Sequence, residues 1–337
     1  MNDESAPFLN GEPRSPVPNP PGNPSPGRSR SRRRRRTRIP LVLFLLTCLS
    51  TFWVGITDWQ PLTDLTRILS GSASTGPIDW MLLRQLLVRN WDQGILYMLA
   101  VLAILLVHEM GHFVATLIYR IPATVPIFLP FPFNPIGTLG AVIGMEGMQA
   151  DRRQIFDIGI AGPLAGLVVA VPLAVLGISQ LDLTQTAGGQ MAFECPLAFQ
   201  WMMQWMEVPG YVPGSNQGVW LSQLNPWFAA AWVGFLVTGL NMMPVGQLDG
   251  GHVTHCVFGR YAYWIAEGVI VFAIAYMVWR GIPYLAIMVL LLLVMGTRHP
   301  PTRDDTVSLG WPRIALGIAS LSIPFLCFPP NIFIFAD

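Results

Sequence analysis

The sequence contains no lysine and few charges of any kind. Charged residues make up 12% of its 337 positions, where soluble domains carry roughly a quarter. Cysteine is also scarce, and the four cysteines show no CxxC spacing, which excludes a disulfide framework and a thiolate zinc cluster. Hydrophobic residues make up 52% of the chain, and the mean hydropathy is +0.49. This composition argues against a soluble enzyme and indicates a membrane protein.

The positive charge is concentrated at the amino-terminal end. Residues 1–38 hold nine of the 20 arginines and three acidic residues, so this segment carries a charge of +6 and the remainder −5. We predict that 1–38 is a disordered Arg/Pro/Ser-rich cytosolic tail, because it is too polar to join a packed core. The arginine run leads directly into apolar residues at Ile39, which favours a membrane-orientation signal and no nucleic-acid partner. A plastid transit peptide is the alternative, but the acidic start and the arginines next to Ile39 fit a bacterial tail better.

Long apolar segments follow the tail. Crossing a hydrocarbon core of about 30 Å takes roughly 20 apolar helical residues. The candidate spans are 39–57, 93–118, 157–178, 226–244, 262–280, 282–297 and 313–335. With the tail in the cytosol, sixteen arginines lie inside and four outside, as the positive-inside rule requires. We therefore predict an all-α polytopic membrane protein with about six to seven transmembrane helices.

One apolar region cannot be a continuous helix. Residues 121–135 contain five prolines, and the following residues 137–144 are rich in glycine and β-branched side chains. Irregular backbone at membrane depth must be shielded by protein or line a cavity. We predict a re-entrant β-hairpin or loop that lies near the active site.

The second span ends in the sequence His108-Glu109-Met110-Gly111-His112, an HExxH motif. On a helix, residues i and i+4 share a face, so both imidazoles can bind one metal ion while Glu109 reaches a water molecule beside it. Three ionisable residues within five positions of an apolar helix cost several kcal/mol unless they serve a function. The motif therefore predicts a metal site with hydrolytic chemistry.

A catalytic zinc site usually has three protein ligands. The third ligand must come from elsewhere in the chain, and Asp249 is the preferred candidate because Pro244 and the neighbouring glycines interrupt a helix at the membrane face that the HExxH motif reaches. The full set of candidates in or beside apolar spans is Asp157, Asp249, His252, His255 and Glu267. We interpret Glu267 as an interhelical hydrogen-bonding residue and His252 as a residue that either orients a ligand or lies at the interface.

The chain resembles the site-2 protease family of intramembrane zinc metalloproteases, as a bacterial-type member without room for a PDZ insertion. The resemblance covers residues 93–300. It depends on HEMGH at 108–112, NMMPVGQLDGG at 241–251, FDIGIAGPLAG at 156–166 and GTLGAVIGM at 137–145.

The resemblance implies one Zn²⁺ per chain, bound by His108, His112 and Asp249, with Glu109 as the catalytic base. It also implies that Asn241 positions the substrate or stabilises the oxyanion. We further expect main-chain contacts with the substrate from a short strand that comprises Gly137, Thr138, Leu139 and Gly140.

The expected activity is hydrolysis of peptide bonds in or near transmembrane segments. Expected partners are membrane lipid and single-span membrane proteins, such as anti-sigma factors or cleaved remnants, in a bacterial inner membrane. The alternatives are a metal transporter, a pseudoprotease that binds without cutting, and a membrane protease that uses Glu267 as third ligand. Transporters tend to spread ionisable residues over several spans and internal repeats, whereas here they converge on two segments.

The expected organisation has four parts. The tail at 1–38 is followed by a first transmembrane helix and external loop at 39–92, the metalloprotease core at 93–300, and a cytosolic loop with a last transmembrane helix at 301–337.

Overall fold

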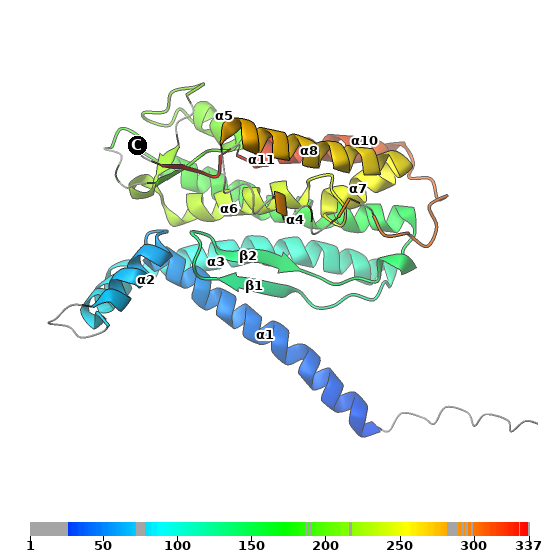
Figure 1. Ribbon diagram of the computed structural model, residues 1–337, viewed down its shortest axis with the longest axis horizontal. Coiled ribbons are helices and arrows are strands. Elements are labelled where there is room, and N and C mark those ends of the chain that lie inside the picture. The colour runs from blue at the N-terminus through cyan, green and yellow to red at the C-terminus, as the bar shows by residue number, and fades with distance from the viewer. Residues whose placement is uncertain are drawn as a thin grey trace, which may run out of the picture. The chain divides into compact units, whose positions relative to one another are not determined.

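The computed structural model describes residues 26–71, 78–185, 188, 191–215, 218–281, 289–290, 293, 296–297, 299–329 and 331–335 (Figure 1). The chain divides into two units, Met1–Ile39 and Pro40–Asp337. Helix α1 (Pro26–Ile56) begins in the first unit. Residues 26–38, which we predicted to be disordered, form the first turns of α1, since arginine is a good helix former. The rest of the predicted tail lies outside the described residues.

The described chain is mostly helical, as predicted, and four of its helical stretches are long and apolar enough to cross a membrane. They are Arg38–Ile56, Trp80–Tyr119, Arg152–Ser179 and Asp249–Arg280. The second is α3, which has 40 residues and begins well before the predicted span 93–118. Its start is set by Asp79, whose side chain accepts a hydrogen bond from the backbone N–H of Leu82. The polar residues between Arg84 and Gln93 hid this start from a prediction based on hydropathy.

The helix in the predicted span 226–244 is shorter than expected. Helix α6 (Pro226–Asn241) has 16 residues and is buried along nearly its whole length by other parts of the chain. It ends where Pro244 approaches, because proline cannot continue a helix. An apolar helix of this length and burial is a core element of the unit.

The carboxyl-terminal third also differs from the predicted spans. Helices α7 (Asp249–Phe258) and α8 (Ala262–Arg280) follow each other directly, so the span predicted at 262–280 is part of a longer apolar stretch. The prediction at 282–297 falls largely outside the described residues. The single span predicted at 313–335 is wrong: two short helices, α10 (Trp311–Ser320) and α11 (Ile323–Cys327), are followed by strand β5 (Phe333–Phe335). Pro324 lies in the first turn of the second helix, where proline is tolerated, and could not continue the first helix.

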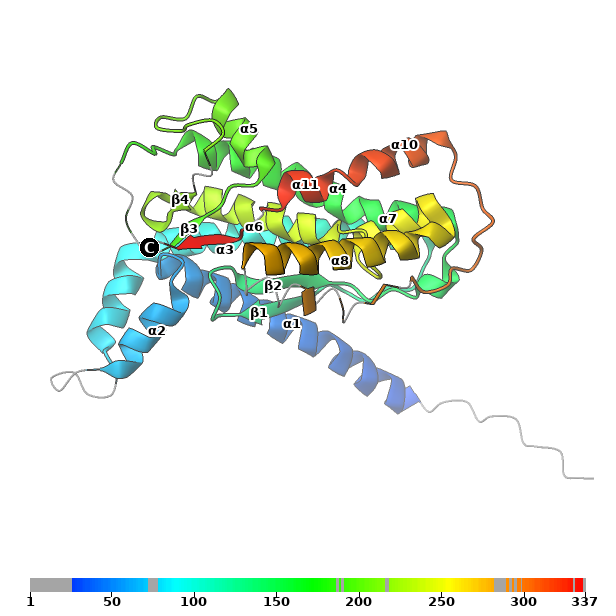
Figure 2. The same ribbon diagram turned by 45° about the horizontal axis from the view of Figure 1, so that its top comes forward.

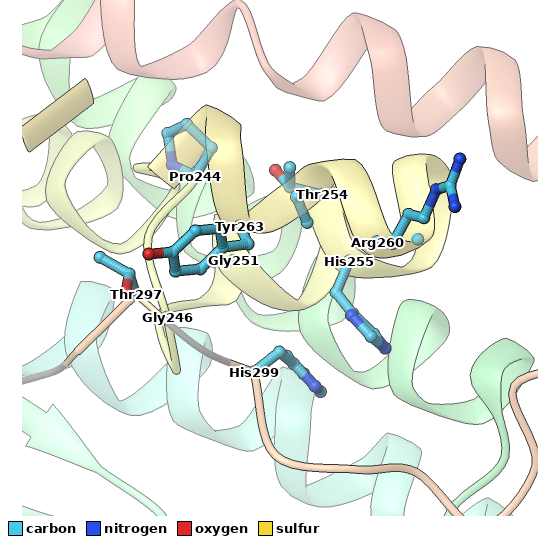
Figure 3. A pocket seen from close by; sticks show the side chains of 11 residues that line it. Pro244, Gly246, Gly251, Thr254, His255, Arg260, Tyr263, Thr297 and His299 are labelled. Atoms are coloured by element: carbon cyan, nitrogen blue, oxygen red, sulfur yellow. The ribbon is translucent and has the colours of Figure 1, made fainter. Parts of the chain in front are cut away.

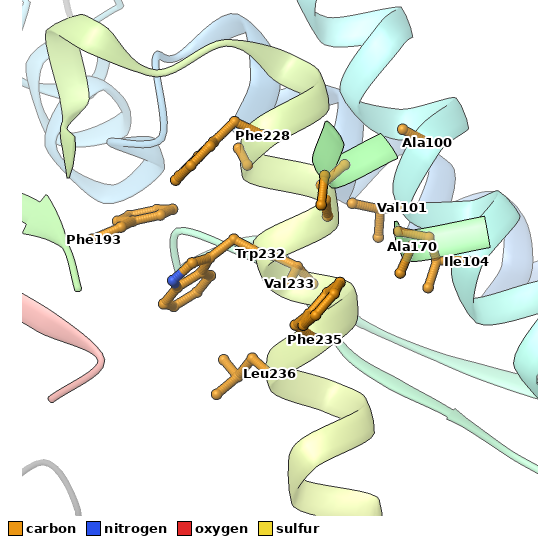
Figure 4. Packing of buried hydrophobic residues seen from close by; sticks show 14 of the residues in the cluster. Ala100, Val101, Ile104, Ala170, Phe193, Phe228, Trp232, Val233, Phe235 and Leu236 are labelled. Carbon is orange, nitrogen blue, oxygen red and sulfur yellow. The ribbon is translucent and has the colours of Figure 1, made fainter. Parts of the chain in front are cut away.

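The core is formed where α3, α4 (Arg152–Ser179) and α6 pack together (Figure 4). Gly234 of α6 lets that helix approach closely, since a Cβ there would lie 2.9 Å from Ile104 of α3 and 3.3 Å from Ala170 of α4. On the other side of α6, the ring of Trp232 packs on Phe193. The three helices therefore hold a fixed register, which positions the site described below.

Small strands complete the unit. Strands β1 (Ile127–Phe131) and β2 (Gly137–Val142) pair antiparallel, with an irregularity between Phe128 and Pro130, and lie along α3 (Figures 1 and 2). The Asn134 side chain closes their turn by accepting hydrogen bonds from backbone N–H groups. The sequence did not indicate a second sheet, in which β3 (Met191–Phe193) pairs with both β4 (Val219–Trp220) and β5. Helices α2 (Pro61–Ser70) and α5 (Leu197–Trp205) lie in the connections.

Candidate metal centre

The HExxH motif lies in the buried half of α3. The exposed fractions of His108, Glu109 and His112 are 2%, 4% and 6%. The two histidines lie one helical turn apart, and their Nε2 atoms are 3.3 Å from each other. The helix thus presents two nitrogen donors at one point inside the bundle.

Two glycines of α4 make room for these imidazoles. A Cβ at Gly162 would collide with the His112 ring, and one at Gly166 would lie 3.1 Å from Nδ1 of His108. The small residues of the GPLAG segment at 162–166 therefore accommodate the histidine side chains as well as the approach of the two helices.

Asp249 is the first residue of α7. The chain reverses between α6 and α7 so tightly that Cβ atoms at Gly250 and Gly251 would collide with backbone atoms of Met242 and Gly246. This close approach requires the two glycines of the LDGG segment, and it brings the Asp249 carboxylate to the histidines from a position 137 residues beyond His112 in the sequence.

The three donor atoms form an equilateral triangle. Asp249 Oδ2 lies 3.3 Å from Nε2 of His108 and 3.3 Å from Nε2 of His112, the same separation as between the two nitrogens. Ligand atoms each roughly 2.0–2.1 Å from a tetrahedral zinc ion are about 3.3 Å apart. The donor set of two imidazoles and one carboxylate, and its spacing, therefore fit zinc. In the described part of the chain this is the one group of three such residues that could hold a metal ion. We refer to it as the metal triad.

The tautomer of His112 is set by the backbone. Its Nδ1 donates a hydrogen bond of 2.7 Å to the carbonyl oxygen of Ile158, which can only accept. The lone pair is therefore on Nε2, toward the other two donors, as a metal-binding histidine requires. The Asn241 side-chain amide, at the end of α6, lies 3.3 Å from His108 Nε2, so this predicted residue is also in the site.

The other candidates for third ligand are elsewhere. Arg313 donates two hydrogen bonds to the Asp157 carboxylate, at 2.7 and 2.9 Å, and the Tyr119 hydroxyl donates a third. Glu267 is not part of the metal triad. Asp157 thus links α3, α4 and α10 as a structural residue.

The four residues predicted to contact substrate occupy different environments. Leu139 is 64% exposed. Gly137 instead packs against α1, where the Ser50 hydroxyl donates to its carbonyl oxygen. The Thr138 hydroxyl donates to the Leu129 carbonyl across the hairpin, and Gly140 is buried beside Val237. The exposed strand position of the segment is therefore Leu139.

A second histidine group, which sequence reasoning missed, lies on α7 and the segment after the 282–297 region. His252 Nδ1 and His299 Nε2 are 2.6 Å apart, and the His255 ring stacks on His299 at 4.1 Å. His255 also lies 3.3 Å from the Asp305 carboxylate. His255 and His299 line one side of a pocket of about 260 Å³ (Figure 3). We call His252, His299 and His255 the histidine chain. Spacing along the sequence carried no signal for it, because His299 is 44 residues from His255.

Hydrogen bonding determines the tautomers in the histidine chain. His299 Nδ1 donates to the Pro300 carbonyl oxygen at 2.5 Å, which leaves its Nε2 to accept from Nδ1 of His252. Burial and the neighbouring imidazoles of His252 and His255 lower the pKa of His299 to about 3. His299 is therefore neutral at physiological pH and acts as a hydrogen-bond acceptor for α7.

Together, the apolar helices and the metal triad define an integral membrane protein with a candidate metal centre inside its helical bundle. The sequence pattern of peptidase family M50 matches residues 96–278. The chain belongs to this family, which is the site-2 protease family that its motifs resemble.

Curated relatives support this assignment. The chain is 29% identical over 302 residues to a protein of Oryza sativa subsp. japonica named "Probable zinc metalloprotease EGY1, chloroplastic", a match that covers 86% of this chain and 50% of the relative. It is 27% identical over 305 residues to the Arabidopsis thaliana protein of the same name, covering 86% and 53%. The chain thus spans about half the length of these relatives. Their names place them in chloroplasts and lend no support to the predicted bacterial inner membrane.

Proposed function

We propose that this chain is an intramembrane zinc metalloprotease that hydrolyses peptide bonds in or near transmembrane segments. The observation that carries the proposal is the metal triad, whose three donor atoms lie 3.3 Å apart within apolar helices. Family M50 membership and the names of the curated relatives support zinc as the metal and proteolysis as the activity.

The chemistry follows from the residue types around the triad. Zinc in this position would supply a Lewis acid that polarises a peptide carbonyl and makes water acidic enough to attack it near neutral pH. Glu109, which follows the first histidine, takes the proton from the attacking water and passes it to the departing amine. The Asn241 amide lies beside His108 and donates a hydrogen bond to the oxyanion that forms on the substrate carbonyl.

The hairpin offers a strand to which a substrate can bind in an extended conformation. A transmembrane substrate helix hides its own backbone groups, so it must unwind before cleavage. We infer that hairpin β1–β2 is re-entrant and that an unwound substrate adds as a strand to β2 beside the exposed Leu139. Gly137 and Thr138 support this strand through their bonds to α1 and β1.

The substrates that this arrangement fits are single-span membrane proteins or their cleaved remnants. We place the arginine-rich tail on the cytosolic side, since the arginine distribution favours it. The four long helices account for four of the six to seven passages that we infer from the sequence.

The test compares wild type with Glu109→Gln in membranes of the producing cells. Quantitative proteomics should find membrane-protein fragments that are missing only in the variant. Zinc in the purified variant should stay near one ion per chain, because the ligands are intact. Equal fragment patterns in the two strains would contradict proteolysis, and zinc without any cleavage by wild type would indicate a transporter or a pseudoprotease.

A further inference from the structure

Two buried side-chain polar atoms have no hydrogen-bond partner in the described part of the chain: the indole nitrogen of Trp59 and the hydroxyl of Thr238. Thr238 lies on α6 and is 1% exposed. A buried hydroxyl without a partner loses its hydration and gains nothing in return, so it destabilises the fold unless it serves another purpose.

The other buried threonines of the described chain behave differently. Each donates its hydroxyl to a backbone carbonyl: Thr47 to Leu43, Thr51 to Thr47, Thr57 to Trp53, Thr116 to Phe113, Thr138 to Leu129 and Thr254 to Gly250. Five of the six bonds are to a carbonyl three or four residues earlier in the chain, a partner that every helical threonine has within reach. The Thr238 hydroxyl makes no such bond.

The register of the helices places Thr238 in the layer of the metal triad. Gly234 of α6 faces Ile104 of α3 and Ala170 of α4. Figure 4 labels the latter two residues. Four residues, or about one helical turn, separate Thr238 from Gly234 on α6, His108 from Ile104 on α3, and Gly166 from Ala170 on α4. His108 and Gly166 approach each other closely.

Asn241 gives an independent check on this register. It lies three residues after Thr238, on the same side of α6, and its amide is 3.3 Å from His108 Nε2. Thr238 and Asn241 therefore form two successive polar positions on the face of α6 that meets α3 at His108. In contrast, the adjacent Gly239 faces α11, where a Cβ would lie 3.2 Å from Cys327.

We propose that the Thr238 hydroxyl binds a backbone peptide group of the substrate beside the scissile bond. This inference rests on the proposed function. An unwound substrate brings N–H and C=O groups into an apolar bundle, where each needs a partner, and a hydroxyl can donate to one and accept from another. The Thr238 hydroxyl, which has no hydrogen-bond partner in the free protein, is thus available to the substrate. Asn241 binds the neighbouring peptide group.

The test uses three purified variants: Thr238→Val, Thr238→Ser and Thr47→Val. Hydrolysis of fluorogenic casein in detergent micelles is the readout, because an already unfolded chain needs no unwinding. Thr238→Val should lower kcat/KM by roughly tenfold, the effect of one lost hydrogen bond, while Thr238→Ser keeps most of it. Thr47→Val, which removes a buried hydroxyl that is already bonded within α1, should cleave like wild type.

Thermal unfolding separates this role from a structural one. Thr238→Val should unfold at the same temperature as wild type or higher, because it removes an unpaired buried hydroxyl, whereas Thr47→Val should unfold at the same temperature or lower. Lower activity with unchanged or higher stability supports the proposal. Full activity in Thr238→Val, or an activity loss that only parallels a loss of stability, overturns it. If wild type cleaves neither casein nor any membrane protein, the proposed function itself fails. If wild type and Thr238→Val cleave equally well, only the role of Thr238 fails.

Discussion

The five histidines of the chain form two neighbouring groups that use the same imidazole ring in different ways. In the metal triad, the two Nε2 atoms lie 3.3 Å apart and share a carboxylate at equal distance. In the histidine chain, the nitrogens of His252 and His299 are 2.6 Å apart, which is the length of a hydrogen bond and is too short for two ligands of one zinc ion. The separation of the nitrogens thus decides between a metal site and a structural bond.

Backbone carbonyls set the same tautomer in both groups. The Ile158 carbonyl binds Nδ1 of His112 and the Pro300 carbonyl binds Nδ1 of His299, so the lone pair of each ring is on Nε2. The difference lies in what this Nε2 faces: for His112 it is the other two donor atoms of the metal triad, and for His299 it is Nδ1 of His252. Four predicted effects test this division, in order of decreasing size.

Asp249→Ala should have the largest effect, because it removes one of three ligands and leaves two imidazoles that hold zinc weakly. We expect zinc affinity to fall by at least about 100-fold and cleavage to be lost. Zinc per chain, measured by mass spectrometry after dialysis, checks the result. His252→Gln is the matched control on the same helix and should keep its zinc. If Asp249→Ala kept its zinc and His252→Gln lost it, the histidine chain would be the metal site and the metal triad would not.

Gly162→Ala should be next, since its new methyl group would collide with the His112 ring. Overpacking of this kind costs about 1–3 kcal/mol, and displacement of the ring should also weaken zinc binding. Gly166→Ala, whose methyl group would lie 3.1 Å from His108 Nδ1, should show a smaller loss of the same type.

Gly268→Ala on α8 is the control for these glycines, because a Cβ there meets nothing within 4 Å. It should bind zinc normally and gain up to about 1 kcal/mol from helix propensity. Zinc titration and thermal unfolding of the three variants give the ranking, and normal zinc affinity in Gly162→Ala would show that the glycine is not needed for the imidazole.

His299→Gln should have a small effect on stability at neutral pH and none on zinc content. His299 faces His252 and His255 of α7, the Pro300 carbonyl and Asp305, and its folded pKa is about 3 against an ordinary 6.5. A histidine with a lowered folded pKa takes up its proton more readily when unfolded, so stability falls as the pH decreases from about 6.5 toward 3. The variant should lose less stability over this range than wild type. Parallel curves from thermal unfolding between pH 4 and 8 would show that His299 does not contribute.

The sequence was sufficient to predict the metal triad's residues but not the surroundings that shape it. HExxH predicts two imidazoles on one helix face from local geometry alone, and the helix-breaking residues around Asp249 indicate a reversal at the same depth. The space that Gly162 leaves for the His112 ring depends on how α3 and α4 are aligned, which is a tertiary contact with no local pattern in the sequence. His299 joins the histidine chain only through tertiary packing.

The fold, like the site, could be predicted from the sequence only in part. Apolar length predicts the helical character and the four long helices, and the prolines after α3 predict a break that the structure shows as paired strands β1 and β2. Hydropathy could not show that α6 is buried by protein, because lipid and a protein core select the same apolar residues. The pairing of β5 with β3 joins residues more than 100 positions apart and leaves no local pattern.

X-ray absorption at the zinc edge of the purified protein tests the central claim most directly. The account predicts one zinc ion with two imidazole nitrogens and oxygen ligands in its first shell, and a change in that shell in Asp249→Ala. A third imidazole would assign the metal to the histidine chain, and a sulfur ligand would assign it to a cysteine; either result would contradict the metal triad as the catalytic centre.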